Sequence, residues 1–166
     1  KGEGIFDSSE GWRLEGYFDG AFDTGQGTLY LDESDAVIRG EFKDGDLVGD
    51  SFIYYETPEG EMYFGDMADG ARDGFGTLVH ANNDAYVGEF EKGVASGTGY
   101  YEYDNGALVM GQYKNGSPNG AASVIDADGV SYQGLFKDGE AHGLILVTQV
   151  DGSQSVETWV DGEKQQ

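Results

Sequence analysis

A glycine recurs at nearly constant spacing along most of the chain, and this regularity constrains the fold more than any other feature of the sequence. The spacings are 24, 25, 23, 23 and 23 residues, with the glycine at Gly16, Gly40, Gly65, Gly88, Gly111 and Gly134. A large apolar residue follows two positions later in every copy, at Phe18, Phe42, Met67, Phe90, Tyr113 and Phe136. A fixed period of this length predicts a repeat architecture in which each copy contacts only its neighbours.

Each copy has the pattern of a β-hairpin. The copy from Tyr86 to Tyr101 contains two strand-like segments, YVGEF and GTGYY, which are joined by a glycine-bearing turn at Lys92 to Ser96. The second segment begins with a glycine in all copies, at Gly25, Gly49, Gly74, Gly97, Gly120 and Gly143. No 3.6-residue period of apolar residues occurs, so we expect no helix.

These observations predict an all-β protein, an elongated single-layer twisted antiparallel sheet of consecutive β-hairpin repeats with a period of about 23 residues. We expect residues 1–166 to form a single repeat domain. Its predicted parts are a partial repeat at 1–11, six repeats at 12–35, 36–60, 61–83, 84–106, 107–129 and 130–152, and a degenerate C-terminal repeat or cap at 153–166. Because KGEGIF at 1–6 matches the second strand of an incomplete hairpin, we expect repeats to continue upstream.

The pattern YxGxFxxGxxxGxG resembles the MORN (membrane occupation and recognition nexus) repeat, and the resemblance extends over nearly the whole chain. Met67 departs from it by replacing an aromatic residue, and Glu157 replaces the leading glycine of the last copy. The resemblance implies a scaffold, a dimerisation module or an appendage to a catalytic domain. The family name also suggests association with membranes.

The chain is strongly acidic, with 32 acidic against 9 basic residues and a net charge of −23. Nucleic acids and anionic lipid surfaces are bound through clustered Lys and Arg, so we expect no nucleic-acid partner and no binding to anionic membranes. Two explanations for the charge stay open. It keeps a long sheet soluble and resists edge-to-edge aggregation, or it attracts a partner with a basic surface. With no cysteine, the sequence gives no indication of the compartment.

Strand alternation sorts the side chains onto two faces. One face combines the repeated glycines with large apolar residues, and we expect it to be the internal packing face because glycines on one strand leave room for rings from the next. Its predicted members are Tyr63, Met67, Leu78, Tyr86, Phe90, Tyr101, Tyr113, Val124, Tyr132 and Phe136.

The opposite face carries aromatic and aliphatic residues among acids such as Glu15, Asp19, Glu41, Asp66 and Glu89. An apolar strip bordered by acids is typical of a partner-binding surface; alternatively, these residues are there because they favour strands. The predicted partner-binding residues are Tyr17, Tyr30, Phe52, Tyr54, Phe64, Phe75 and Tyr100. Ile125, Leu144 and Leu146 are predicted on the same face.

No motif in the sequence predicts a reaction centre. His80 and His142 lie more than two repeats apart, and GVASGTG at 93–99 lacks the Lys-Ser/Thr of a phosphate-binding loop. The acidic turns at 32–35 and 126–129 lack the ligand spacing of a calcium loop. We therefore expect no catalytic residues, no cofactor and no specific metal site.

Taken together, the sequence predicts a non-enzymatic repeat scaffold that binds proteins through an aromatic-lined, acid-rimmed sheet face. The expected partner has a basic surface, and self-association is a further expectation. The alternatives are a module that associates peripherally with membrane phospholipids, and an accessory targeting domain of a larger enzyme.

Overall fold

The computed structural model describes residues 2–9, 11–19, 24–31, 36–44, 46–48, 51–57 and 60–166, and for 36, 46–47 and 51–56 it describes the backbone alone. Throughout this part of the chain the elements are β-strands. No helix in it is long and apolar enough to span a bilayer. The predicted all-β class of antiparallel hairpins is confirmed. The chain forms two compact units, Lys1–Ala81 with Glu91–Gly93, and Asn82–Phe90 with Val94–Gln166.

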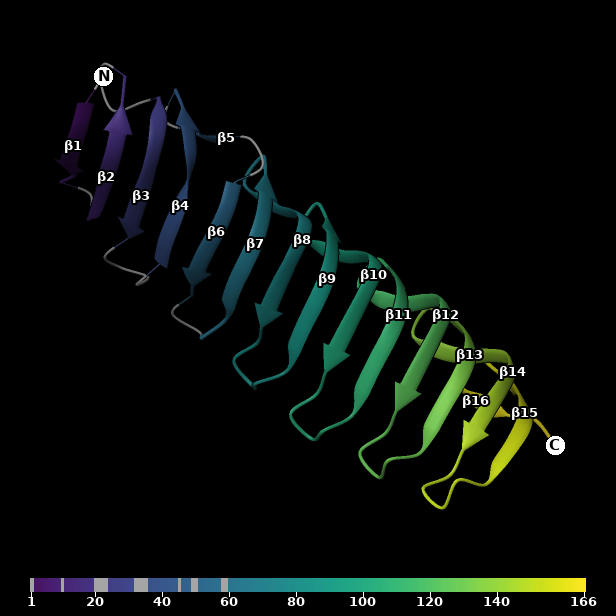
Figure 1. Ribbon diagram of the computed structural model, residues 1–166. Coiled ribbons are helices and arrows are strands. Elements are labelled where there is room, and N and C mark those ends of the chain that lie inside the picture. The colour runs from purple at the N-terminus through teal and green to yellow at the C-terminus, as the bar shows by residue number, and fades with distance from the viewer. Residues whose placement is uncertain are drawn as a thin grey trace. The chain divides into compact units, whose positions relative to one another are not determined.

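The first unit contains eight strands, and consecutive strands pair antiparallel within β1 to β5 and within β6 to β8 (Figure 1). Their bounds are β1 (Gly2–Asp7), β2 (Trp12–Phe18), β3 (Gly25–Leu31), β4 (Ala36–Lys43), β5 (Asp46–Val48), β6 (Ser51–Glu56), β7 (Met62–Ala68) and β8 (Ala71–Val79). The repeated glycines face one another across the first four strands. Gly4 pairs with Gly16, Gly16 with Gly27, and Gly27 with Gly40.

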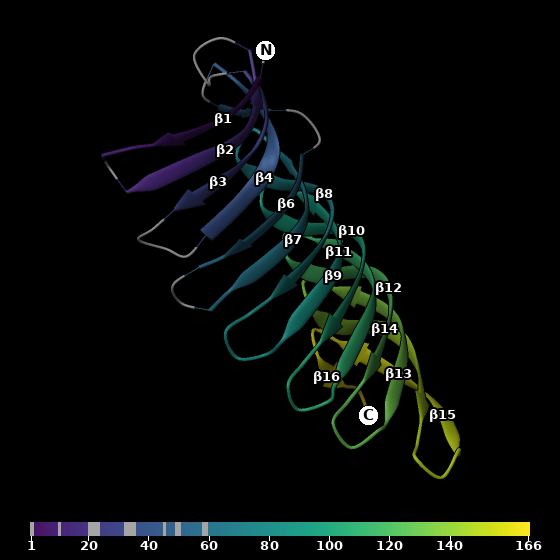
Figure 2. The same ribbon diagram turned by 60° about the vertical axis from the view of Figure 1, so that its left-hand side comes forward.

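The second unit continues the same pattern, with each strand beside the next one in sequence (Figure 2). Its strands are β9 (Ala85–Glu91), β10 (Val94–Glu102), β11 (Leu108–Lys114), β12 (Ser117–Ile125), β13 (Ser131–Lys137), β14 (Glu140–Thr148), β15 (Gln154–Val160) and β16 (Glu163–Lys164). The turns between copies use glycines with positive φ, such as Gly106 and Gly129.

The hairpin turns are shorter than the sequence suggested. The turn expected at Lys92 to Ser96 comprises Lys92 and Gly93, and β10 already begins at Val94. Both turn residues have positive φ, 50° and 88°, as in a two-residue type I′ turn. The glycine expected to begin the second strand, Gly97, instead lies inside β10 with a φ of 64°.

Glycines with positive φ inside the second strand of a hairpin coincide with β-bulges. In β12 the register against β11 shifts between the pairs Gly111–Ala122 and Tyr113–Pro118, where Gly120 has a φ of 115°. The same shift occurs in β8 and β14. A bulge bends its strand and increases its twist, and the longer strands of both units are bent.

Backbone hydrogen bonds also link several hairpin turns to the preceding hairpin. The turn N–H of Gly116 donates to the Ala95 carbonyl at 2.9 Å, and that of Gly139 donates to the Pro118 carbonyl at 2.8 Å. These bonds join successive copies at the turns as well as along the strands. In a repeat protein, contacts between neighbouring copies provide much of the stability.

The predicted packing face is largely confirmed. Seven of its ten residues, Tyr63, Met67, Leu78, Tyr86, Phe90, Tyr113 and Phe136, are buried, and Tyr101, Val124 and Tyr132 are half-buried. Leu14, Phe18 and Phe42 form the core of β2 to β4, with Trp12, Leu29 and Ile38 packed against them. We call this glycine-bearing side of each sheet the inner face and the opposite side the outer face.

Some predicted features lie outside the described residues. These are Lys1, Gly49 and the acidic turn at 32–35, together with the side chains of Phe52 and Tyr54. The boundaries of the repeats stay a prediction.

Candidate functional site

On the inner face, aromatic rings cover the repeated glycines. A Cβ atom added at Gly99 or Gly76 would overlap the ring of Tyr86 or Tyr63, so a side chain at either glycine would displace the ring. The Tyr86 ring is further held by edge-to-face contacts with Phe90 and Tyr113, with ring centroids 5.0 and 5.1 Å apart. Its hydroxyl donates to the Glu89 carbonyl at 3.0 Å.

Four tyrosines gather on the inner face of the second unit. Tyr101 lies beside Tyr103, with ring centroids 4.6 Å apart, and donates a hydrogen bond to the Asp84 carboxylate at 3.1 Å. Burial raises the pKa of Tyr86 to about 12, and burial together with the Asp84 hydrogen bond raises that of Tyr101 to about 12. Burial also raises the pKa of Tyr113. These hydroxyls are therefore neutral at physiological pH and act as hydrogen-bond donors rather than as bases.

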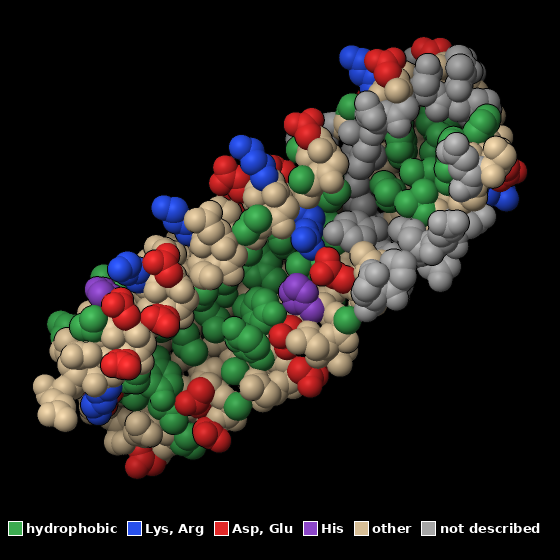
Figure 3. Space-filling model, turned by 180° about the vertical axis from the view of Figure 1, so that it is seen from behind, with side chains coloured by type: hydrophobic (Ala, Val, Ile, Leu, Met, Phe, Trp, Pro, Cys, Tyr) green, Lys and Arg blue, Asp and Glu red, His purple; other side chains and the backbone are tan. Residues whose placement is uncertain are grey.

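The inner face is hollowed in the second unit. Hydrophobic side chains line the hollow and charged side chains stand along its rims (Figure 3). The floor consists mainly of the buried and half-buried side chains that form the core, such as Val109, Val124 and Tyr132. This side is therefore primarily a packing surface, as the sequence predicted.

Outer-face aromatic residues of the first unit are exposed where the sequence placed a binding strip. The exposed fractions of Tyr17, Phe64 and Phe75 are 54%, 49% and 58%. Tyr30 is half-buried and pairs with Arg13 and Val37. These large apolar side chains are exposed to solvent, and strand pairing fixes their positions, so they are available for contact with another molecule.

The strand pairings give the positions of these residues within each unit. Tyr17 pairs with Gln26, and Tyr30, on the neighbouring strand, pairs four residues away with Arg13. Phe64 pairs with Thr77, two residues from Phe75. Tyr100 belongs to the second unit, is half-buried, and donates to the Glu102 carboxylate at 3.2 Å. The backbone of Tyr54 pairs with that of Phe64, and of Phe52 with Asp66.

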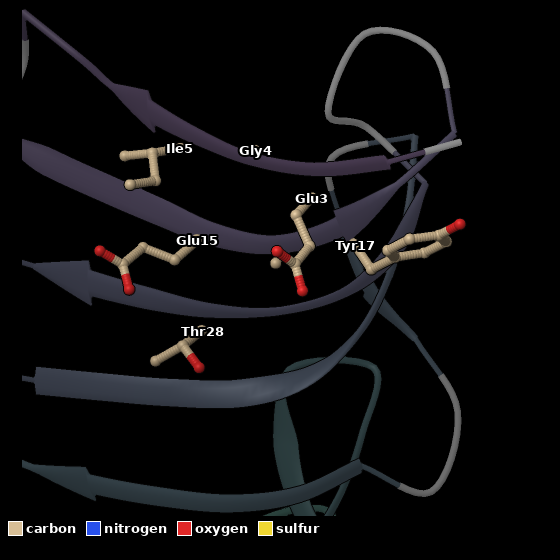
Figure 4. Close-up of a pocket in the computed structure, with 7 residues that line it drawn as sticks. Glu3, Gly4, Ile5, Glu15, Tyr17 and Thr28 are labelled. Carbon is tan, nitrogen blue, oxygen red and sulfur yellow. The ribbon is translucent and has the colours of Figure 1, made fainter.

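A polar hollow adjoins Tyr17 on the outer face of β1 to β3 (Figure 4). Glu3 and Glu15 project into it beside the Tyr17 ring, and Thr28 borders it. Glu15 also pairs with Arg13, whose guanidinium lies 2.6 Å from its carboxylate. Two carboxylates beside an aromatic ring form a suitable site for a cationic side chain.

Acidic residues of the outer face also bond to the bulged strands. The Asp66 carboxylate accepts from the Phe75 N–H at 2.9 Å, and the Glu89 carboxylate accepts from the Thr98 N–H at 2.8 Å. Both carboxylates thus satisfy a backbone donor next to a bulge glycine. The equivalent positions of the next two copies are Gln112 and Leu135, which carry no charge.

The sequence interpretation gave little weight to the outer face of the second unit, where several strongly exposed aliphatic side chains lie. Leu135, Leu144 and Val156 have exposed fractions of 58%, 68% and 66%. A shallow groove on this face is lined by Met110, Ala121, Ser123, Leu135, Leu144 and Leu146. Leu144 and Leu146 were expected on this face, whereas Met110, Leu135 and Val156 were missed. The replacement of the repeated acid by Gln112 and then Leu135 was the available signal.

The histidines and the acidic turn at 126–129 make local contacts. His80 Nδ1 lies 3.5 Å from a Glu61 oxygen, and His142 Nδ1 lies 3.3 Å from an Asp161 oxygen. The Asp126 carboxylate accepts from the backbone N–H groups of Asp128 and Val130 at 3.0 and 2.9 Å. Among the residues that the structure describes, no group of three His, Cys, Asp or Glu side chains is arranged to hold a metal ion.

Comparison with known proteins agrees with the repeat pattern. The profile of the MORN repeat matches residues 63–85, 86–108 and 132–144. No curated protein sequence matches the chain.

Among solved structures, the chain is similar to the SAS-4 (dCPAP) TCP domain of Drosophila melanogaster, in complex with a proline-rich motif of Ana2 (dSTIL). The TM-score is 0.51 at 12% identity, covering 95% of this chain and 90% of that one. A second structure, the TCP10c domain of Drosophila melanogaster Sas-4, has a TM-score of 0.49 at 11% identity, with 95% of this chain and 99% of that chain covered. At 12% identity, the similarity to the first of these structures shows a shared fold and nothing more.

The matched segments cover β7 to β10, and then β13 with the first part of β14. Antiparallel hairpins, inner-face glycines covered by aromatic rings, and the three profile matches all lead to the same conclusion. The chain contains MORN repeats at residues 63–85, 86–108 and 132–144.

Proposed function

We propose that this chain is a non-enzymatic protein-interaction module whose first unit binds a basic segment of a partner on its outer face. The observation that carries the proposal is the exposure of Tyr17, Phe64 and Phe75 on a protein with a net charge of −23. Exposed aromatic residues dominate the energetics of many protein interfaces because each buries a large area at low entropic cost.

Acidic side chains around these aromatics favour a cationic partner. Glu3 and Glu15 line the outer-face hollow together with Tyr17, and the Asp66 carboxylate accepts from the Phe75 N–H. A Lys or Arg of the partner could contact the Tyr17 ring and a carboxylate together. Such complementarity speeds association and disfavours acidic partners.

An extended peptide is the kind of partner that the fold supports. The SAS-4 TCP domain, to which the fold of this chain is similar, is seen with a proline-rich motif of Ana2. An extended segment can lie across the outer face of the first strands, with a side chain in the hollow beside Tyr17. Phospholipid association, the alternative from the sequence, is opposed by the net charge.

A selection of random linear peptides displayed on phage, with the purified chain as bait, tests the proposal. We expect selected peptides to be enriched in Lys and Arg and to bind less tightly as salt is raised. For the best peptide, the triple variant Tyr17→Ala, Phe64→Ala and Phe75→Ala should raise the Kd by about tenfold or more.

The matched control is the double variant Leu144→Ala and Val156→Ala, which removes equally exposed side chains from the second unit. It should leave the Kd unchanged. Circular dichroism and thermal melts verify that both variants are folded. Selected peptides without Lys or Arg, or equal binding by the triple variant, would overturn the proposal.

A further inference from the structure

Two copies of the repeat use a carboxylate of their own to complete the hydrogen bonding of a bulge. Asp66 accepts from the Phe75 N–H at 2.9 Å, and Glu89 accepts from the Thr98 N–H at 2.8 Å. In both cases the acid follows the repeated glycine of the first strand, and the donor follows the bulge glycine of the second strand. A carboxylate is therefore a group that this backbone geometry binds.

The copy formed by β13 and β14 keeps the bulge but has no such acid. The residue in the acid position is Leu135, and the donor position is the backbone N–H of Leu144. A Cβ built at Gly74 or Gly97 would lie 2.8 or 2.6 Å from an oxygen of the local carboxylate, whereas one built at Gly143 meets nothing within 4 Å. The outer face above this bulge is therefore open where the other two copies hold a carboxylate.

The copy formed by β11 and β12 differs in a way that closes the equivalent position. Its residue in the acid position is Gln112, whose Cβ lies 3.2 Å from a Cβ built at the bulge glycine Gly120. The Gln112 amide turns toward β10 and donates to the Thr98 hydroxyl at 3.0 Å. The stem of this side chain covers the bulge, so we assign the open position to the Leu144 copy alone.

An apolar groove surrounds the open position. The groove is lined by Met110, Ala121, Ser123, Leu135, Leu144 and Leu146. The exposed fractions of Leu135 and Leu144 are 58% and 68%. A ligand with an apolar group next to its carboxylate would bury these side chains while its oxygen accepts from the Leu144 N–H.

A lysine lies on the same face of β13. Lys137 is two residues from Leu135 and so points to the same side, roughly 7 Å along the strand. Its Nζ lies 4.0 Å from an Asp161 oxygen, and both side chains are more than half exposed, so this ion pair is weak. Glu140 pairs with Lys137 in register, but its carboxyl group lies beside Gly162. The Lys137 ammonium can therefore turn toward an anion above Leu144.

We propose that the outer face of β13 and β14 binds an acidic and apolar peptide segment of a partner, with an Asp or Glu carboxylate on the Leu144 N–H. The carboxylate takes the place that Asp66 and Glu89 fill in their own copies, and Lys137 supplies the positive charge. Apolar neighbours of that acid occupy the groove over Leu135 and Leu144. A short segment brings few negative charges to a chain of charge −23, whereas an anionic bilayer would bring many. This site does not depend on the basic segment proposed for the first unit.

Amide NMR spectra of the full chain, titrated with the capped peptide SGLDLGS, test the central contact. The Leu144 amide proton should move downfield, because a carboxylate acceptor strengthens its hydrogen bond. The amides of Phe75 and Thr98 are bonded to the chain's own carboxylates and should stay in place. The peptide SGLNLGS, with Asn in place of Asp, should shift Leu144 much less. Equal shifts with both peptides, or no shift of Leu144, would overturn the proposal.

Leu135→Glu restores the acid that the repeat has at Glu89 and should close the site from within. We expect it to raise the Kd for SGLDLGS at least about tenfold while the Tm rises, so lost binding cannot be attributed to unfolding. Leu135→Gln removes the same apolar contact without adding a carboxylate, and should raise the Kd only about two- to threefold. Unweakened binding by Leu135→Glu would contradict the assignment of Leu144 as the donor.

A second pair of variants tests the positive charge. Lys137→Gln should raise the Kd about threefold or more, whereas Lys164→Gln should leave it unchanged, because Lys164 is bound to Glu157 at 2.7 Å. Equal effects of the two variants would show that only net charge matters. Phosphatidylserine vesicles provide the last comparison. Flotation of the chain with these vesicles that Leu135→Glu abolishes, together with no response to SGLDLGS, would identify a membrane as the occupant and overturn the proposal.

Discussion

Gly99 lies directly beneath the ring of Tyr86, and this contact explains why small and large residues alternate in the repeat. The ring covers Gly88 and Gly99 on neighbouring strands and reaches a backbone carbonyl with its hydroxyl. No positive φ is involved at Gly99, so the requirement for glycine there is one of space. A larger residue would have to move a ring that Phe90 and Tyr113 hold in place.

We expect Gly99→Ala to lower the free energy of unfolding by about 1 to 3 kcal/mol, the usual cost of overpacking a well-packed core. Denaturant unfolding measures the change. Gly2→Ala is the matched control, because a Cβ there meets nothing within 4 Å, and it should be neutral. Equal stability of the two variants would mean that the ring moves freely and that the glycine pattern has another cause.

The tyrosines predict a loss of stability at alkaline pH. Burial raises the pKa of Tyr86 and of Tyr101 to about 12, whereas an unfolded tyrosine titrates near pH 10. The folded state holds these protons more tightly, so the stabilisation is complete below about pH 10 and is lost as the pH rises to about 12. Urea unfolding at a series of pH values should show this decline. Tyr86→Phe should make it shallower, and an unchanged slope would contradict the assignment.

The sequence was informative about the inner face and less so about the outer face. Seven of the ten residues predicted to pack are buried, and in the copies of Tyr63 and Tyr86 the ring and the glycine are required by one and the same contact. Outer-face residues are not constrained in this way, so alternation alone could not separate the exposed Phe75 from the half-buried Tyr30. It also hid Leu135 and Val156, whose exposure depends on their neighbours across strands.

At the scale of elements, the hairpin was predictable from glycine spacing, but its internal geometry was not. Gly97 and Gly120 look like strand boundaries in the sequence, and in the structure they lie inside nine-residue strands as bulge positions. Both a turn and a bulge require positive φ, and glycine supplies it equally well in either. A turn glycine differs from a bulge glycine in that its N–H donates to a carbonyl of the preceding hairpin, as Gly116 donates to Ala95. This contact between copies cannot be seen in the local sequence.

At the scale of the whole molecule, the outer faces of the two units differ in where they carry acidic residues. The first unit combines exposed aromatics with Glu15 and Asp66, whereas in the second unit Gln112 and Leu135 replace the repeated acid and Leu144 is exposed. Acidic residues are present throughout the sequence, so composition predicted a basic partner but could not predict where charge is absent. Strand register was needed for that, because outward residues of five strands become neighbours only in the sheet.

Net charge also predicts how the stability of this protein responds to salt. With 32 acidic and 9 basic residues, repulsion among carboxylates outweighs the few ion pairs, such as Arg72 with Glu61 at 3.0 Å. Added sodium chloride screens that repulsion, so we expect the Tm at neutral pH to rise by several degrees, equivalent to about 1 to 2 kcal/mol. Differential scanning calorimetry at low protein concentration measures this change in Tm. Near the pI of about 4.1 the net charge vanishes and the same salt should have little effect. A Tm that is flat or falls with salt at neutral pH would show that local ion pairs, rather than the overall charge, govern the stability of the repeats.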